Sequence, residues 1–195
     1  MAVLLAFAYV TLFSARPRGL DLVLGLAAVG AIALDAARSR RLWAAVPRTE
    51  SCAADAWREM LLFTAGAALA LAVIGAAAAP SELVARLTNW HLLPLVFIYL
   101  PWACLQQFVF QFYFLGRLLH VVPAALAIAL TAAAFSAVHF PRYPVMTVTA
   151  VAGVVWALSY RRHRRLAPVA VSHAVLGPVL HYWVLGRDLL ADWLP

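Results

Sequence analysis

The chain has 195 residues, of which 66% are hydrophobic and only 12% are charged, and its mean hydropathy is +0.89. This balance excludes an ordinary soluble domain and predicts a membrane protein surrounded by a lipid bilayer. All 15 basic residues are arginines, and with 8 acidic residues they give a formal net charge of +7. These arginines lie between long uncharged stretches and not along one face of a soluble domain, so we expect no nucleic-acid partner. The length predicts a single membrane domain over residues 1–195.

The N-terminal part predicts two short membrane helices. Residues 1–15 are apolar up to Arg16. They lack the basic start and the small-residue cleavage site of a signal peptide, so we expect them to form the first helix. Residues 22–34, between Asp21 and Asp35, are short for a crossing and need their flanks to complete it.

Five longer windows without a charged residue follow, and they have 22, 30, 24, 18 and 21 residues. About 20 helical residues cross the roughly 30 Å of bilayer hydrocarbon. Each window therefore predicts one membrane helix: residues 60–81, 87–116, 118–141, 143–160 and 166–186. With the two N-terminal helices, the predicted fold is an all-α, polytopic membrane helical bundle of about seven transmembrane helices.

Two arginine clusters predict the orientation of the bundle. The first comprises Arg38, Arg40, Arg41, Arg48 and Arg58, and the second comprises Arg161, Arg162, Arg164 and Arg165. Basic loops stay in the cytoplasm, and the four predicted helices between the clusters return the chain to the same side. We therefore expect an integral, multi-pass protein of a prokaryotic-type cell membrane with a cytoplasmic N-terminus. Its oligomeric state is left open.

A few polar side chains lie inside the uncharged windows, where a bilayer makes them costly. They are Gln106, Gln107, Gln111, His139 and His173. Glutamines in membrane helices often serve as hydrogen-bonding contacts between helices, and a histidine near a helix end can simply face the interface. His173 is different because it stands among Ala, Val and Leu, where an imidazole needs a polar partner.

This set of side chains is a poor match to metal or serine chemistry. Zinc takes three or more His, Cys or carboxylate ligands, and the last four windows offer no Glu or Asp. Ser136 and Ser172 stand in no nucleophile elbow. We expect no metal and no cofactor.

Three short motifs follow one another on successive predicted helices. They are Gln106-Gln107-x-x-x-Gln111, Phe135-x-x-x-His139 and His173-x-x-x-Gly177. Their order and spacing resemble the CPBP family, the CAAX-protease and bacteriocin-processing group of intramembrane endopeptidases. Its members carry Glu-Glu-x-x-x-Arg, Phe-x-x-x-His and His-x-x-x-Asn. The resemblance defines a CPBP-like core over residues 90–182.

The resemblance implies hydrolysis of peptide bonds in membrane-associated protein or peptide substrates by a glutamic-type centre. In that centre a carboxylate activates water, and the histidines position it and stabilise the oxyanion. Gln106 and Gln107 stand in place of both glutamates, so any enzymatic activity comes from a degenerate catalytic centre. A glutamine amide can hold a water but cannot accept its proton. Histidine exchanges protons near neutral pH, which leaves His139 or His173 as the candidate base.

The remaining site residues have supporting roles in this interpretation. Phe135 completes the second motif, while Gln111 replaces the motif arginine and Gly177 replaces the motif asparagine. Loss of these groups together with both glutamates favours an alternative, a catalytically inactive pseudoprotease that binds or escorts membrane segments. A small transporter component is a third possibility, but no inverted repeat or intramembrane charge supports it.

Overall fold

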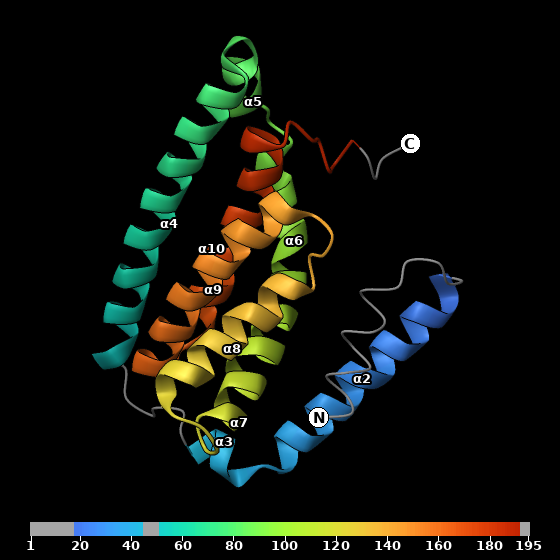
Figure 1. Cartoon of the computed structure of the whole chain (residues 1–195), viewed down its shortest axis with the longest axis vertical. Helices are drawn as coiled ribbons and strands as arrows, with labels where there is room; N and C mark the ends of the chain where they lie inside the picture. The colour runs from blue at the N-terminus through green and yellow to red at the C-terminus, as the bar shows by residue number, and fades with distance from the viewer. Residues whose placement is uncertain (1–17, 45–50, 192–195) are drawn as a thin grey trace. The chain divides into compact units, whose positions relative to one another are not determined.

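The computed structural model describes residues 18–44 and 51–191, and within these ranges all regular structure is helical. The predicted all-α membrane bundle is therefore confirmed, whereas the first predicted helix, residues 1–15, lies outside the described residues. The α-helices are α2 (Arg18–Arg38), α3 (Arg40–Ala44), α4 (Ser51–Ala78), α5 (Leu83–Leu87), α6 (Leu92–Gln107), α7 (Gly116–Leu118), α8 (Ala124–Ala137), α9 (Tyr143–His163) and α10 (Leu166–Val179) (Figure 1). A short 3₁₀ helix, η1 (Pro80–Glu82), and two π-helices, η2 (Phe108–Leu115) and η3 (Leu180–Val184), connect or extend them.

The helices divide into two compact units. The first unit comprises residues 1–48 and 108–164, and the second comprises residues 49–107 and 165–195. A single membrane domain over the whole chain stays a prediction, and so do the bounds of the core at residues 90–182.

The second unit is built around α10, which packs against α6 and α4. In Figure 1, α4 runs alongside the red and orange segment that contains α10. Small and hydroxyl residues make this packing close: Thr64 of α4 donates a hydrogen bond to Ser172 of α10 across 2.8 Å. At the far end of α4, Gly75 lies against the backbone carbonyl of Trp183 in η3.

The first unit is held together by the crossing of α8 and α9 and by their contacts with η2. Gly153 of α9 meets Ala132 of α8 so closely that an added Cβ would lie 3.1 Å from the Ala132 Cα. Near the end of α2, Asp35 forms an ion pair with Arg117 of α7 at 2.6 Å. Tyr113 of η2 donates a second hydrogen bond to the Asp35 carboxylate, which holds the pKa of Asp35 below its usual value.

Three helices are long and apolar enough to cross a membrane. They are Ala53–Ala78, Leu92–Leu118 and Tyr143–His163, and a shorter apolar helix covers Ala124–Ala137. Four large apolar side chains of α4 are about 60% or more exposed, which suits a face in contact with lipid: Leu61, Leu62, Leu69 and Val73. The chain is therefore an integral membrane protein. The total of seven crossings stays a prediction.

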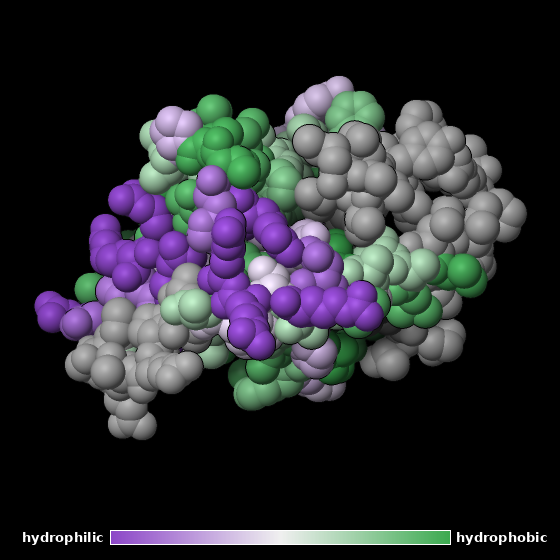
Figure 2. Space-filling model, turned by 90° about the horizontal axis from the view of Figure 1, so that it is seen from below, coloured by the Kyte–Doolittle hydropathy of each residue, from purple (hydrophilic) through white to green (hydrophobic). Residues whose placement is uncertain are grey.

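Charged residues of the first unit gather at helix ends. Arg38, Arg40 and Arg41 at the end of α2 and in α3 are exposed, and so are Arg161 and Arg162 in the last turn of α9. Figure 2 views the molecule from below Figure 1, and hydrophilic residues gather on this face with hydrophobic residues around them. The apolar middles and charged ends of these helices match the polarity of a bilayer and its surfaces.

Candidate active site

The two glutamines of the first motif are the last two residues of α6 and are buried in the second unit. Gln106 is 9% exposed and Gln107 is fully buried. The Nε2 of Gln107 lies 3.1 Å from Nδ1 of His173 on α10. The structure thus joins the first and third motifs through one hydrogen bond between two residues that are 66 positions apart in sequence.

Tyr99 of α6 extends this polar contact and was missed by the sequence analysis. Its hydroxyl lies 3.3 Å from Nε2 of His173 and 3.4 Å from Oε1 of Gln106. Its ring stands edge-on to the imidazole, with centroids 5.6 Å apart and an interplanar angle of 85°. The signal available in the sequence was the i, i+7 spacing of Tyr99 and Gln106, which places both on one face of α6.

Both ring nitrogens of His173 therefore have polar partners, and one of them is an amide. Because the Gln107 amide can rotate by 180°, it can donate to an unprotonated Nδ1 or accept from a protonated one. In the described part of the chain, the remaining atom of this amide, Oε1 of Gln107, has no hydrogen-bond partner. The cluster of Tyr99, Gln106, Gln107 and His173 can hold polar groups, but it contains no carboxylate to accept a proton.

Gly177 lies one turn after His173 and faces Tyr99. A Cβ added there would lie 2.9 Å from Cε1 of the Tyr99 ring. The carbonyl of Gly177 accepts a hydrogen bond from Nδ1 of His181 across 3.0 Å. Gly177 therefore contributes close packing where the family motif has a polar side chain.

Phe135 and His139 of the second motif lie in the first unit. Phe135 is fully buried at the centre of an aromatic cluster, edge-on to Phe110, Trp156 and His139. The half-buried His139 donates from Nδ1 to the Phe135 carbonyl across 3.0 Å. Since a carbonyl can only accept, the neutral imidazole of His139 carries its lone pair on Nε2.

Gln111 also lies in the first unit, inside the π-helix η2. Its side chain is fully buried, and neither Oε1 nor Nε2 finds a hydrogen-bond partner among the described residues. Leaving such a buried polar atom unpaired costs about 1–3 kcal/mol. π-Helical turns are rare and often occur at functional sites, which makes this amide a reasonable candidate for a supporting role.

The predicted site residues are thus divided between the two units. Gln106, Gln107, His173 and Gly177 lie together in the second unit, while Gln111, Phe135 and His139 lie in the first. The convergence of His139 with His173 stays a prediction. In residues 18–44 and 51–191, no three His, Cys, Asp or Glu side chains are grouped to hold a metal. The absence of a metal or cofactor in the functional protein also stays a prediction.

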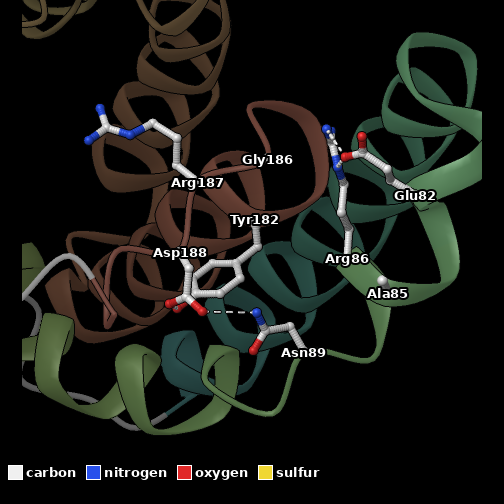
Figure 3. A pocket seen from close by; sticks show the side chains of 8 residues that line it. All are labelled: Glu82, Ala85, Arg86, Asn89, Tyr182, Gly186, Arg187 and Asp188. Carbon is white, nitrogen blue, oxygen red and sulfur yellow. Dashed lines mark hydrogen bonds and ion pairs between the residues drawn. The ribbon is translucent and has the colours of Figure 1, made fainter. Parts of the chain in front are cut away.

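A second polar cluster, which the sequence analysis did not identify, lies beyond the end of η3 (Figure 3). Its centre is the Asp188 carboxylate, which accepts hydrogen bonds from the Tyr182 hydroxyl, from Nδ2 of Asn89 at 3.1 Å and from the Ala191 N–H at 3.0 Å. Nδ1 of His91 lies 2.6 Å from the same carboxylate. Desolvation raises the pKa of Asp188, but these hydrogen bonds outweigh it and hold the pKa well below its usual value.

An open pocket of about 200 Å³ lies beside this cluster. Arg86 forms its wall by bonding to Glu82 at 2.8 Å and to the Val184 carbonyl at 3.1 Å, while Arg187 points away from Tyr182 and Asn89 (Figure 3). Gly186 has a positive φ of 62°, and a Cβ there would lie 2.5 Å from Nη2 of Arg86. Together with the contacts of Asp188, these contacts hold the segment after η3 against α5 and against Asn89 and His91, which lie just before α6.

Comparison with known proteins bears on the first of these two clusters. A family model described as type II CAAX prenyl endopeptidase Rce1-like matches residues 87–177, slightly less than half of the chain. Neither curated proteins nor solved structures gave a match. The matched segment contains all three motifs. It confirms the resemblance seen in the motifs: over residues 87–177 the chain is similar to the CPBP family of intramembrane endopeptidases.

Proposed function

We propose that this chain is a CPBP-type intramembrane endopeptidase-like protein that processes membrane-associated protein or peptide substrates with a degenerate catalytic centre. The observation that carries the proposal is the hydrogen bond from Gln107 to His173, between two buried side chains at motif positions. It supports a polar centre that keeps the contact between helices but has lost the carboxylate. The similarity of residues 87–177 to this family adds support for membrane-associated substrates.

In this proposal different residues of the chain position the water, accept its proton and stabilise the oxyanion. The amides of Gln106 and Gln107 position the attacking water, since an amide both donates and accepts hydrogen bonds. An imidazole then accepts the proton of that water. His139 is suited to this step because its Nδ1–H is engaged by the Phe135 carbonyl, which leaves the lone pair on Nε2. His173 serves as a second base or as the donor that stabilises the oxyanion.

A slow reaction is the expected consequence of the missing carboxylates. A well-placed general base contributes roughly 10²- to 10⁴-fold to the rate. The two amides hold water without taking its proton, so the rate depends on histidines alone. We therefore expect turnover far below that of a centre with both glutamates.

The second candidate function is that of a pseudoprotease that binds or escorts membrane segments. The unpartnered Oε1 of Gln107 and the unpartnered amide of Gln111, both among the described residues, favour it. Such groups can accept or donate hydrogen bonds to a bound backbone without any proton transfer. This function needs the same polar side chains but no base.

The experiment uses the purified full chain in lipid nanodiscs with a panel of membrane-associated peptides. Mass spectrometry detects new peptide termini, and photo-crosslinking of the same peptides detects binding. We expect slow cleavage that is strongly reduced, with a residual rate, in both His139→Ala and His173→Ala. Binding without new termini would favour the pseudoprotease. Failure of both cleavage and binding would contradict both functions.

The same proposal includes the orientation in the membrane. We place the N-terminus and both arginine clusters on the cytoplasmic side. The exposed arginines at the ends of α2 and α9 support this placement. The membrane is of the prokaryotic cell-membrane type.

A further inference from the structure

We propose that Tyr99 is a positioning residue for His173 and that Gly177 is the residue that makes room for it. This inference rests on the proposed function, because it assigns a role at the same polar site. It concerns three residues of the second unit, on α6 and α10. None of the three family motifs includes Tyr99.

The packing of the Tyr99 ring is the first argument. His173 and Gly177 are four residues apart on α10, so they share one helix face. A Cβ at Gly177 would lie 2.9 Å from Cε1, 3.5 Å from Cζ and 3.6 Å from the hydroxyl oxygen of Tyr99. The tyrosine ring therefore occupies the space that a side chain at 177 would need. Glycine at this position is what lets α6 present a tyrosine to the histidine.

The hydrogen bonds give the second argument. When Nε2 of Gln107 donates to Nδ1 of His173, the neutral imidazole carries its proton on Nε2. That Nε2–H then donates to the Tyr99 oxygen at 3.3 Å, and the Tyr99 O–H donates to Oε1 of Gln106 at 3.4 Å. In this arrangement the imidazole N–H and the Tyr99 O–H each have an acceptor. The proton positions are assigned from these contacts.

The consequence for His173 is a fixed ring orientation and a preferred tautomer. Gln107 and Tyr99 hold the two opposite nitrogens, and the edge-on contact at 5.6 Å restricts rotation of the imidazole plane. The third family motif has an asparagine one turn after its histidine. In this chain Gly177 takes the place of that asparagine. The polar group next to the imidazole is instead the Tyr99 hydroxyl, which comes from a different helix, α6.

The test uses Tyr99→Phe, which removes only the hydroxyl and keeps the ring against Gly177. Tyr113→Phe is the matched control. It lies on the same candidate membrane span and also loses a hydrogen bond, but to Asp35 in the first unit. The chain is labelled with ¹⁵N-histidine in nanodiscs, and His173→Gln identifies the His173 signals. We expect Tyr99→Phe to shift the Nδ1 and Nε2 signals of His173 toward a mixture of tautomers, and Tyr113→Phe to leave them unchanged.

Peptide processing provides the second measurement. We expect Tyr99→Phe to lower kcat about tenfold, which is the effect of losing one hydrogen bond, with little change in KM. The pH profile of kcat should also change. In a His173→Gln background, the effect of Tyr99→Phe should vanish, because Tyr99 acts through that ring. His173 signals that are identical in Tyr99→Phe and in the parent chain would overturn the inference. A tautomer shift without cleavage in any variant would leave the positioning role intact and contradict only the proteolytic function.

Discussion

Gln107 and His173 hold α6 and α10 together through a hydrogen bond of 3.1 Å from Nε2 to Nδ1 inside the apolar part of the second unit. An amide in this place suits either form of the imidazole, because rotation exchanges its donor and its acceptor. A carboxylate could only accept, and it would favour the charged imidazole. The pair therefore keeps the contact between the helices without fixing the charge of His173.

Because α4 packs closely on η3, we expect one methyl group added at Gly75 to destabilise the protein. A Cβ at Gly75 would overlap the Trp183 carbonyl oxygen, so Gly75→Ala must move the backbone of α4 away from the backbone of η3. We expect it to lower the free energy of unfolding by about 1–3 kcal/mol, the range for overpacked sites. Thermal unfolding in detergent measures the change.

Gly66→Ala is the matched control on the same helix. Nothing lies within 4 Å of a Cβ at Gly66, and alanine favours the helix by up to about 1 kcal/mol. This variant should be as stable as the parent chain or more so. Equal unfolding temperatures for both alanine variants would contradict the close contact between α4 and η3.

The cluster around Asp188 predicts a stability that depends on pH. The pKa of this carboxyl is lowered in the folded chain, so its contribution is present above the unfolded value of about 3.9. It is lost as the pH falls through the lower, folded value. We expect Asp188→Asn to destabilise the protein at pH 7 by about 1–2 kcal/mol, a reduced figure because the side chain is 28% exposed.

The pH series for this variant runs from 7 to 3 in detergent, with Asp55→Asn as the control at an exposed position on α4. The gap between parent and Asp188→Asn should stay constant down to about pH 4 and narrow below it. A gap that is unchanged at pH 3 would show that the charge of Asp188 does not stabilise the fold.

The positions of the charged residues in the sequence predict much of the observed helical framework. The window between Arg86 and Arg117 contains most of the observed span Leu92–Leu118, and the window after Arg142 begins where α9 begins. Charge is costly in hydrocarbon, so uncharged stretches of sufficient length must cross it. The π-helix η2 was not predictable, because no glycine or proline in its run FVFQFYFL marks a change of helix type.

The candidate site was only partly predictable for a related reason. Glutamines and histidines stand out in an apolar helix because burial there demands a partner. A tyrosine such as Tyr99 does not stand out in this way, because its apolar ring packs well among apolar side chains. Only the contacts in the structure show what its hydroxyl does. The cluster at Asp188 joins residues as far apart as Asn89, 99 positions away, and no local pattern encodes that contact.

The predicted convergence of His139 and His173 can be tested by crosslinking. In a chain without Cys52 and Cys104, His139→Cys and His173→Cys are combined and treated with a short bifunctional maleimide. We expect an intramolecular crosslink, because both side chains are predicted to share one water-accessible cavity. The pair of His120→Cys with His173→Cys is the control. Crosslinking no better than in the control, or labelling at 139 by lipid-soluble reagents alone, would rule out a shared cavity.

Orientation in the membrane is open to a direct measurement. Seven crossings from a cytoplasmic start place the C-terminus on the opposite side. A reporter active only in the cytoplasm should therefore work when fused to the N-terminus or inserted after Arg165, and fail when fused after Pro195. A working C-terminal fusion would show that the crossings are even in number and would contradict a crossing by residues 1–15 or by residues 22–34.

The chemistry of the centre predicts a gain of function from a small change. Gln106→Glu combined with Gln107→Glu keeps the shape of both side chains and supplies a group that can accept the proton of water. We expect cleavage to rise by roughly 10²- to 10⁴-fold, the usual contribution of a general base. The gain should depend on pH, because a carboxyl must be ionised to act as a base. New peptide termini measured by mass spectrometry across a pH series provide the readout.

Two controls make the result of this exchange decisive. Gln111→Glu is the same substitution on the same span, at a position where the family motif has an arginine, and it should not raise the rate. Amounts of folded protein are compared in parallel, because a charged residue near the bilayer centre costs about 2.5–3.5 kcal/mol on insertion.

If the parent chain already cleaves efficiently and keeps that activity without His139 and His173, the assigned roles are wrong. If the folded double variant binds peptides but cuts none, the missing motif arginine and asparagine become limiting, and the pseudoprotease gains support.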